Sequence, residues 1–190
     1  MMIDNPEVTV PELTAVIKGP DFPTAGFIHG YEGIKQAYTT GRGIIQMRAR
    51  AVIEEGKNDR ESIVISELPY QVNSAKLLER IGELVQEKKI TGISEIRNES
   101  DREGMRIVID LKKGEIATVI LNQLYKHTAM QSTFGVIMLA LVNNQPRILN
   151  LRKLLAHFIQ HRREVGNPGA GDPGHAPPAA DRAGTRQDHR

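Results

Sequence analysis

Residues 44–53 read Ile-Ile-Gln-Met-Arg-Ala-Arg-Ala-Val-Ile, and this stretch decides the fold. Every second side chain is apolar, which is the period of a β-strand that buries one face. The predicted inward face consists of Ile45, Met47, Ala49, Ala51 and Ile53. The opposite face carries Arg48 and Arg50, and Arg42 lies upstream in the same register. The stretch therefore predicts one long strand with an apolar face and an arginine stripe.

Further strands are expected beside it. Residues 62–68 are rich in β-branched side chains and follow a polar turn at residues 56–60, so they should return antiparallel to the first strand. Residues 93–96 and 105–111 form a second predicted pair across a charged turn. The nearly continuous apolar run at residues 134–142 predicts a buried strand.

Helical periodicity marks three longer segments. Residues 74–89 have apolar side chains three and four positions apart and end in two lysines, which suit the helix dipole. Residues 115–126 form a second amphipathic helix, whose expected buried side chains are Ile116, Val119, Ile120 and Leu124. A third helix starts at Leu151, with Asn150 as its cap. Shorter helices are predicted at residues 10–18 and 33–39.

The order of these elements mixes helices and strands without a strict βαβ alternation. This order predicts an α+β fold, in which an antiparallel sheet carries helices packed on one side. The last segment, residues 166–190, has no Ile, Leu, Val, Met, Phe, Tyr or Trp and is dominated by Gly, Pro and Ala. We expect it to be disordered, because it cannot bury a core.

Composition excludes several classes of protein. The chain has 190 residues, 39% of them hydrophobic, and no cysteine, so it has no disulfide framework, thiol nucleophile or cysteine-bound zinc. A cytoplasmic protein is expected, without a membrane partner, because no apolar run is long enough to span a bilayer. Phosphate-loop, His-Glu-x-x-His and Gly-x-Ser-x-Gly motifs are all missing, so we expect no catalytic residue, metal ligand or cofactor site in this chain.

Duplex DNA is the expected partner, although the net charge of +2 argues for it only weakly. Aromatic residues make up 4% of the chain, too few for a stacking platform for single strands. Backbone phosphates of a duplex are therefore the predicted ligand of the stripe formed by Arg42, Arg48 and Arg50. The alternative is an ordinary solvated strand face.

A second candidate group lies at a strand-to-helix turn. Gln71, Asn73 and Lys76 could present a backbone amide and a cation to a phosphate. Helix capping alone would also explain Asn73. Both interpretations stay open at this point.

Several stretches, in the same order and spread over residues 10–165, resemble the A subunits of bacterial type II topoisomerases, the family of DNA gyrase and topoisomerase IV. They are Gly19-Pro-Asp-Phe-Pro-Thr24, Tyr38-Thr-Thr-Gly-Arg-Gly43 with Arg48-Ala-Arg50, Glu67-Leu-Pro-Tyr-Gln-Val-Asn73, Gly104-Met-Arg-Ile-Val-Ile109, Phe134-Gly135, Gln145-Pro146 and His161-Arg-Arg-Glu-Val165. No single stretch is specific, but the ordered set is.

The resemblance implies a domain organisation. Residues 1–19 would end the winged-helix, breakage-reunion region, and residues 20–149 would form the tower domain. Residues 150–165 would start the coiled-coil arm, and residues 166–190 depart from the family pattern. In this family two A and two B subunits cut one duplex through tyrosine links, pass a second duplex and reseal the break. ATP and Mg²⁺ act through the B subunit.

The resemblance also implies that the fragment is catalytically inactive. The family's catalytic tyrosine stands in an Arg-Tyr-Thr context, and none of Tyr31, Tyr38, Tyr70 and Tyr125 follows an arginine. The expected function is that of a DNA-binding tower fragment. Its partners in the parent complex would be the gyrase B subunit, a second copy of the parent polypeptide and duplex DNA. The alternative is a structural spacer between the cleavage core and the coiled coil, without DNA contact.

Overall fold

The computed structural model describes residues 1–56, 60–102 and 104–166. Residues 57–59 of the predicted turn and residues 167–190 of the predicted disordered tail lie outside this part. The elements in chain order are α1 (Val10–Val16), β1 (Phe27–His29), α2 (Glu32–Thr40), β2 (Arg42–Arg48), β3 (Arg50–Glu55), β4 (Glu61–Glu67), α3 (Ser74–Gln86), β5 (Ile93–Asn98), β6 (Ile107–Leu111), α4 (Ala117–His127), β7 (Gln131–Ile137), β8 (Leu139–Val142), β9 (Gln145–Ile148) and α5 (Leu151–Gly166).

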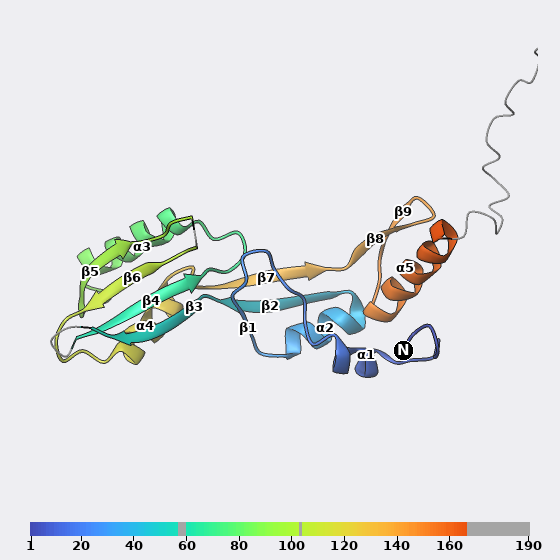
Figure 1. Cartoon of the computed structure of the whole chain (residues 1–190), viewed down its shortest axis with the longest axis horizontal. Helices are drawn as coiled ribbons and strands as arrows, with labels where there is room; N and C mark the ends of the chain where they lie inside the picture. The colour runs from blue at the N-terminus through green and yellow to red at the C-terminus, as the bar shows by residue number, and fades with distance from the viewer. Residues whose placement is uncertain (57–59, 103, 167–190) are drawn as a thin grey trace, which may run out of the picture.

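The strands form three antiparallel sheets. Sheet A has the order β1-β2-β7, sheet B has the order β3-β4-β6-β5, and β8 and β9 form a two-stranded hairpin. Figure 1 shows an elongated molecule with sheet B, α3 and α4 at one end, sheet A in the middle, and the hairpin with α5 at the other end. The α+β class with antiparallel strands and packed helices is confirmed, and the strands are divided among three sheets.

The long strand predicted at residues 44–53 is interrupted at Ala49. β2 ends at Arg48 in sheet A, and β3 begins at Arg50 in sheet B. The Ala49 N–H donates to the Met130 carbonyl at 2.8 Å, and the Ala49 carbonyl accepts from the Tyr125 hydroxyl at 3.0 Å. The apolar alternation continues through the junction, so the sequence pattern alone does not reveal the change of partner strand.

The predicted inward face is also only partly buried. Ile45, Met47 and Ala49 are at most 2% exposed, whereas Ile53 is 37% exposed. Ile53 lies on β3, the edge strand of sheet B. Burial therefore fades along β3, because an edge strand has neighbours on one side only.

Two separate cores hold the molecule together. The larger core lies between sheet B and the helices α3 and α4, and it contains Ile63, Ile65, Leu77, Ile81, Leu84, Ile107, Ile109, Ile120 and Leu124. The smaller core joins the inner face of sheet A to α1, α2 and the start of α5 through Leu13, Ile34, Tyr38, Ile45, Met47 and Leu151. Each buried Ile or Leu contributes about 1.5–3 kcal/mol, so the larger core is the main source of stability.

Helix α4 shows the predicted type but a different buried face. Ala117, Ile120 and Leu124 are buried, as the 3.6-residue period requires. Ile116 and Val119, which were expected to be buried, are 62% and 50% exposed. α4 begins at Ala117, so Ile116 is its cap residue and Val119 lies on the outer side. That part of the prediction is wrong.

The apolar run at residues 134–142 is not one buried strand either. It is divided between β7 and β8, and exposed side chains alternate with half-buried ones throughout. Ile137, Leu139 and Leu141 are 58%, 60% and 74% exposed. The error arises because an apolar side chain was taken as evidence of burial at every position.

Local signals were more reliable. The Asn73 side chain accepts from the Lys76 N–H at 3.1 Å and caps α3, and the Asn150 side chain accepts from the Lys153 N–H at 2.9 Å and caps α5. The strand pair β3–β4 and the strand pair β5–β6 are both confirmed. Helix α2 ends at Gly41, which adopts φ 84° in the left-handed region.

Helix α2 lies directly on the backbone of β2. A Cβ atom at Gly33 would collide with the Ile44 carbonyl, and one at Gly43 would collide with the Gly33 carbonyl. Both positions therefore require glycine. This close contact fixes β2 against the helix and leaves the other face of sheet A free of α2.

The Ala49 junction generates a stability prediction. Tyr125→Phe removes the hydroxyl that donates to the Ala49 carbonyl, and it should lower the free energy of unfolding by about 1 kcal/mol. Urea denaturation measures this change. Tyr31→Phe is the matched control, because the Tyr31 side chain is 47% exposed, and it should leave stability unchanged. Equal stabilities for both variants would contradict the role of the hydrogen bond.

Candidate nucleic-acid interface

The outer face of sheet A is open and carries no carboxylate. Paired residues of neighbouring antiparallel strands point to the same face. The face opposite the core therefore consists of Phe27, His29, Arg42, Ile44, Gln46, Arg48, Gln131, Thr133, Gly135 and Ile137. Ile44 is 68% exposed, which shows how little covers this face. Two arginines and no Asp or Glu give it a positive formal charge.

Arg42 lies at one end of this face. It is the first residue of β2 and is exposed, and within the described part of the chain its guanidinium has no acidic partner. Arg42 and Arg48 are six residues apart on one strand, a distance of about 20 Å. Arg42 is therefore the cation of the predicted stripe that is most available to a phosphate.

Arg48 is held in place by two neighbours. Its Nε donates to Gln131 Oε1 at 2.6 Å, and its guanidinium carbon lies 5.0 Å from the centre of the Tyr125 ring. Burial raises the pKa of Tyr125, an effect that the positive charge of Arg48 opposes. The Tyr125 phenol therefore stays neutral at neutral pH. Because one of its donors is used by Gln131, Arg48 has fewer donors to offer a phosphate.

Arg50 is partly neutralised. Its Nε lies 3.0 Å from Glu67 Oε1, and its guanidinium carbon lies 4.7 Å from the centre of the Phe27 ring. Glu67 also accepts a hydrogen bond from the Gly26 N–H at 2.8 Å, so this carboxylate is fixed beside the arginine. Phe27 pairs with Arg48 in sheet A. The structure thus brings Arg48 and Arg50 together around Phe27, despite the strand break between them.

Gln71, Asn73 and Lys76 form a second group. With Arg80 and Ala129 they line a shallow hollow of about 310 Å³ at the start of α3. The Asn73 side-chain oxygen is used in the helix cap. The Lys76 side chain is exposed and, among the residues that the structure describes, has no acidic partner. Of the three, Lys76 is the best placed to meet an anion.

Sequence analysis missed Arg80 as a member of this group. Arg80 follows Lys76 by four residues, so the two side chains share a helix face, and this spacing was the available signal. Its Nη1 lies 2.7 Å from Glu83 Oε2. Gln131, which positions Arg48, gave no signal, because it is 83 residues away in the sequence.

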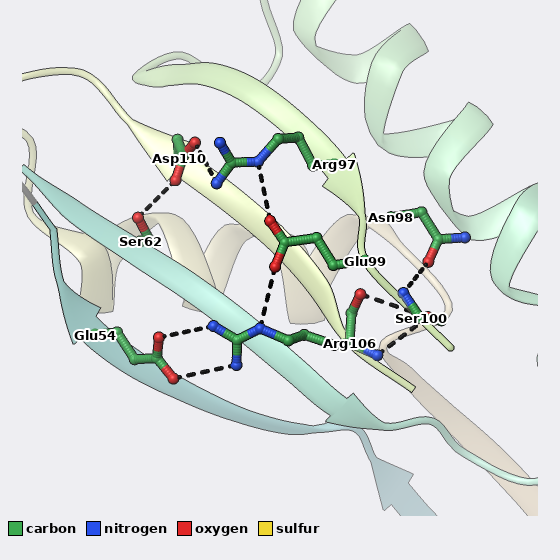
Figure 2. A network of polar contacts seen from close by, with 8 residues as sticks. All are labelled: Glu54, Ser62, Arg97, Asn98, Glu99, Ser100, Arg106 and Asp110. Carbon is green, nitrogen blue, oxygen red and sulfur yellow. Dashed lines mark hydrogen bonds and ion pairs between the residues drawn. The ribbon is translucent and has the colours of Figure 1, made fainter. Parts of the chain in front are cut away.

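The outer face of sheet B has the opposite electrostatic character. Figure 2 shows Arg106 between Glu54 and Glu99, at 3.0 and 3.2 Å, and Arg97 between Glu99 and Asp110, at 3.4 and 3.0 Å. The hydrogen bonds to Glu54, then to Glu99, raise the pKa of Arg106. With Glu95, 4.0 Å from Arg97, four carboxylates surround two guanidinium groups, for a formal charge of −2.

This network has a structural purpose. Val64 and Val108 point to the outer face of sheet B, yet they are only 2% and 4% exposed. The network members Arg97 and Arg106 have long aliphatic stems that can lie over such valines while the charged heads stay in water. Arg97 and Arg106 are each paired with at least two carboxylates and are therefore not free to bind phosphate.

No group of three or more His, Asp or Glu side chains suited to a metal ion occurs among the described residues. Likewise, no helix within the described ranges is long and apolar enough to cross a membrane.

A family model that describes the A subunits of DNA gyrase and topoisomerase IV matches residues 1–168. The chain belongs to this family. The resemblance found in the sequence motifs is thereby confirmed. The match also covers every element of the described structure, from α1 to α5.

Three curated relatives are named as the A subunits of DNA gyrase. The protein of Clostridium acetobutylicum is 58% identical over 165 residues, which are 87% of this chain and 20% of the relative. The protein of Pseudomonas aeruginosa is 58% identical over 166 residues, 86% of this chain and 18% of the relative. The protein of Staphylococcus aureus is 53% identical over 162 residues, which are 85% of this chain and 18% of the relative. The chain thus spans about a fifth of the length of these gyrase proteins.

The charged face of sheet B generates a second prediction. Arg106→Gln should lower the free energy of unfolding slightly at low ionic strength, since it leaves Glu54 and Glu99 close together without their shared cation. The loss should shrink in 1 M salt, where the Debye length falls to about 3 Å. Arg147→Gln is the control, because in the described structure the Arg147 side chain hydrogen-bonds to Gln145 and pairs with no carboxylate. A salt-independent loss would rule out an electrostatic role.

Proposed function

We propose that this chain is the DNA-binding tower segment of a DNA gyrase A subunit, and that the outer face of sheet A contacts the phosphate backbone of a duplex. One observation carries the proposal. Of the motif's arginines, Arg42 and Arg48 lie on a face without carboxylates, and Arg50 lies beside it, paired with Glu67. The outer face of sheet B instead carries, among the described residues, a network of two arginines and four carboxylates. A polyanion is attracted to the first face and repelled by the second.

The contact would work through charge and shape. A guanidinium group can donate two parallel hydrogen bonds to one phosphate, and it releases counterions from the duplex as it binds. Arg42 supplies a free cation, and the fixed position of Arg48 lowers the entropy lost on binding. Such contacts add affinity without reading the base sequence.

Within the complete complex, this segment would have a supporting part. Two A and two B subunits would cleave one duplex, pass a second through the break and reseal it, with ATP and Mg²⁺ acting through the B subunit. The domain boundaries expected from the resemblance, at residues 19, 149 and 165, belong to this proposal, as does a cytoplasmic location. This chain would contribute no metal ligand and no nucleophile.

The environments of Tyr38, Tyr70 and Tyr125 support the last point. Tyr125 donates to the Ala49 carbonyl, and Tyr70 packs against Phe22 and Phe134 with ring centres 5.6 and 5.9 Å apart. Tyr38 is buried, and burial, then Tyr31 and Asp21, raise its pKa. A phenol with a raised pKa is a poor nucleophile at neutral pH.

A structural spacer is the second candidate function. It is favoured by the internal contacts of Arg48 and Arg50, which explain both residues without any ligand. In that case sheet A and sheet B would only separate the cleavage core from the coiled coil. The two functions differ in whether the chain has a salt-dependent affinity for duplex DNA.

DNA binding by the arginines is tested with a salt series. The chain should bind a long duplex with an affinity that falls as salt rises, and the triple variant Arg42→Ala, Arg48→Ala, Arg50→Ala should bind more weakly, with a shallower slope of log affinity against log salt. Each lost phosphate contact reduces that slope by about one unit. Arg42→Ala alone should account for most of the change. Fluorescence anisotropy measures the affinity.

The control is Arg106→Ala, which removes an arginine from the acidic face of sheet B and should leave the slope unchanged. If the triple variant and the wild type show the same slope, the spacer function is correct.

A further expected outcome concerns catalysis. Mixed with a gyrase B subunit, ATP and Mg²⁺, the chain should neither relax nor cleave plasmid DNA, because no tyrosine has the required Arg-Tyr-Thr context. Gel assays with detergent trapping detect covalent adducts. An adduct that maps to one of the four tyrosines would overturn this part of the proposal.

A further inference from the structure

We propose that residues 131–142 form a strand edge, and that an extended, uncharged segment from elsewhere in the intact parent polypeptide pairs with it as a further strand. The proposal is independent of DNA binding, because the edge contains no cation. It rests on the backbone geometry of β7 and β8, on the exposure of their side chains, and on the family relation.

β7 and β8 follow one continuous extended course. Exposed and half-buried positions alternate without a change of phase from Thr133 to Val142, straight through Met138. The Met138 N–H donates to the Gly41 carbonyl at 2.8 Å, and the Met138 carbonyl accepts from the Leu149 N–H at 3.0 Å. On this side, therefore, the neighbouring strand changes from β2 to β9, while β7 and β8 act as one strand.

The other side of this strand is free. In a strand, the backbone groups of alternate residues point to opposite sides. The backbone N–H and carbonyl of Met138 point towards β2 and β9, so those of the odd-numbered residues point away from these strands. The odd-numbered residues are Thr133, Gly135, Ile137, Leu139 and Leu141. Among the residues that the structure describes, these outward groups have no backbone partner. The edge is thus a row of five available backbone positions.

The sequence of this strand edge lacks the features that usually protect an exposed edge. Residues 131–142 contain no charged residue and no proline, the devices by which natural proteins protect an exposed edge. Ile137, Leu139 and Leu141 are all more than half exposed on the same side. A long, uncharged, apolar edge pairs readily with another strand, which indicates that a strand covers it in the assembled protein.

The most suitable occupant is a strand from the same polypeptide family outside the matched stretch. In the curated relatives about four-fifths of the polypeptide lies outside it, so those proteins have ample chain to supply one. The exposed Ile and Leu side chains favour a partner strand with apolar residues at alternate positions, which would pack on the same side of the sheet. A duplex is disfavoured, because the edge offers no cation to its phosphates.

Hydrogen exchange tests the proposal. One sample is the present chain, and the other is the complete Clostridium acetobutylicum protein in which the 165 matched residues of this chain replace the corresponding stretch. Amide exchange at Thr133, Gly135, Ile137, Leu139 and Leu141 should be slower in the complete protein, by roughly 100-fold or more. The amides of Phe134 and Val136, already paired with β2, are internal controls and should be protected in both samples.

Two results would overturn the proposal. Equal exchange of the outward amides in both samples would show that nothing pairs with the edge. Protection in the isolated chain that increases with its concentration, with a matching rise in sedimentation coefficient, would identify a second copy as the occupant instead.

A pair of variants sharpens the result. Ile137→Lys places a charge on the edge, and Ile44→Lys places one on the same face of sheet A but on the central strand β2. In the complete protein, Ile137→Lys should accelerate exchange at Gly135 and Leu139, and Ile44→Lys should not. Equal effects of the two variants would indicate a general loss of stability and contradict pairing at the edge.

Discussion

The structure depends on how the backbone is held at Ala49. There the chain leaves one sheet and enters another, and both backbone groups of a fully buried residue must find partners, since an unpaired buried amide or carbonyl is costly. Met130 and Tyr125 supply those partners from the loop and helix that precede β7. The same contacts fix the register of β2 against β7, and with it the arrangement of Arg48, Gln131 and Tyr125.

The two sheets that meet at this junction carry different charges on their open faces. Sheet A has an open face with arginines and without acids, and sheet B has an open face on which acids outnumber arginines. The mild net charge of +2 conceals this division, because the two faces largely cancel. The net charge of the chain therefore says little about its binding partners. The distribution of charged side chains over the faces of the sheets is more informative.

How far the sequence could predict the structure depended on the range of the interaction. Asn73 and Asn150 were identified as caps because a cap and its helix are neighbours in the sequence. The break at Ala49 could not be predicted, because alternation of side chains is the same whether a strand keeps its partner or changes it. Ile116 and Val119 were misplaced for a related reason: apolar character shows which side chains can be buried, and only the packed helix shows which are.

Prediction of the candidate site also depended on how far apart in the sequence the interacting residues lie. The arginines of residues 42–50 were found from their spacing and their family motif. The sequence did not show which of their guanidinium groups are free to bind a phosphate. Whether an arginine is free depends on side chains far away in the sequence, such as Gln131 for Arg48, and no local pattern contains that information. Arg80 lies one helical turn beyond Lys76, so helical periodicity was sufficient to predict that the two share a face.

The end-to-end layout of the sheets has a mechanical consequence. In Figure 1 the strands of sheet A run close to the long axis of the molecule, and the chain passes from β2 into β3 without a loop. Antiparallel hydrogen bonds lie across the strands, so a pull along the axis strains all the rungs of a ladder at once, and covalent bonds carry the load between the sheets. The molecule should therefore resist extension along its long axis.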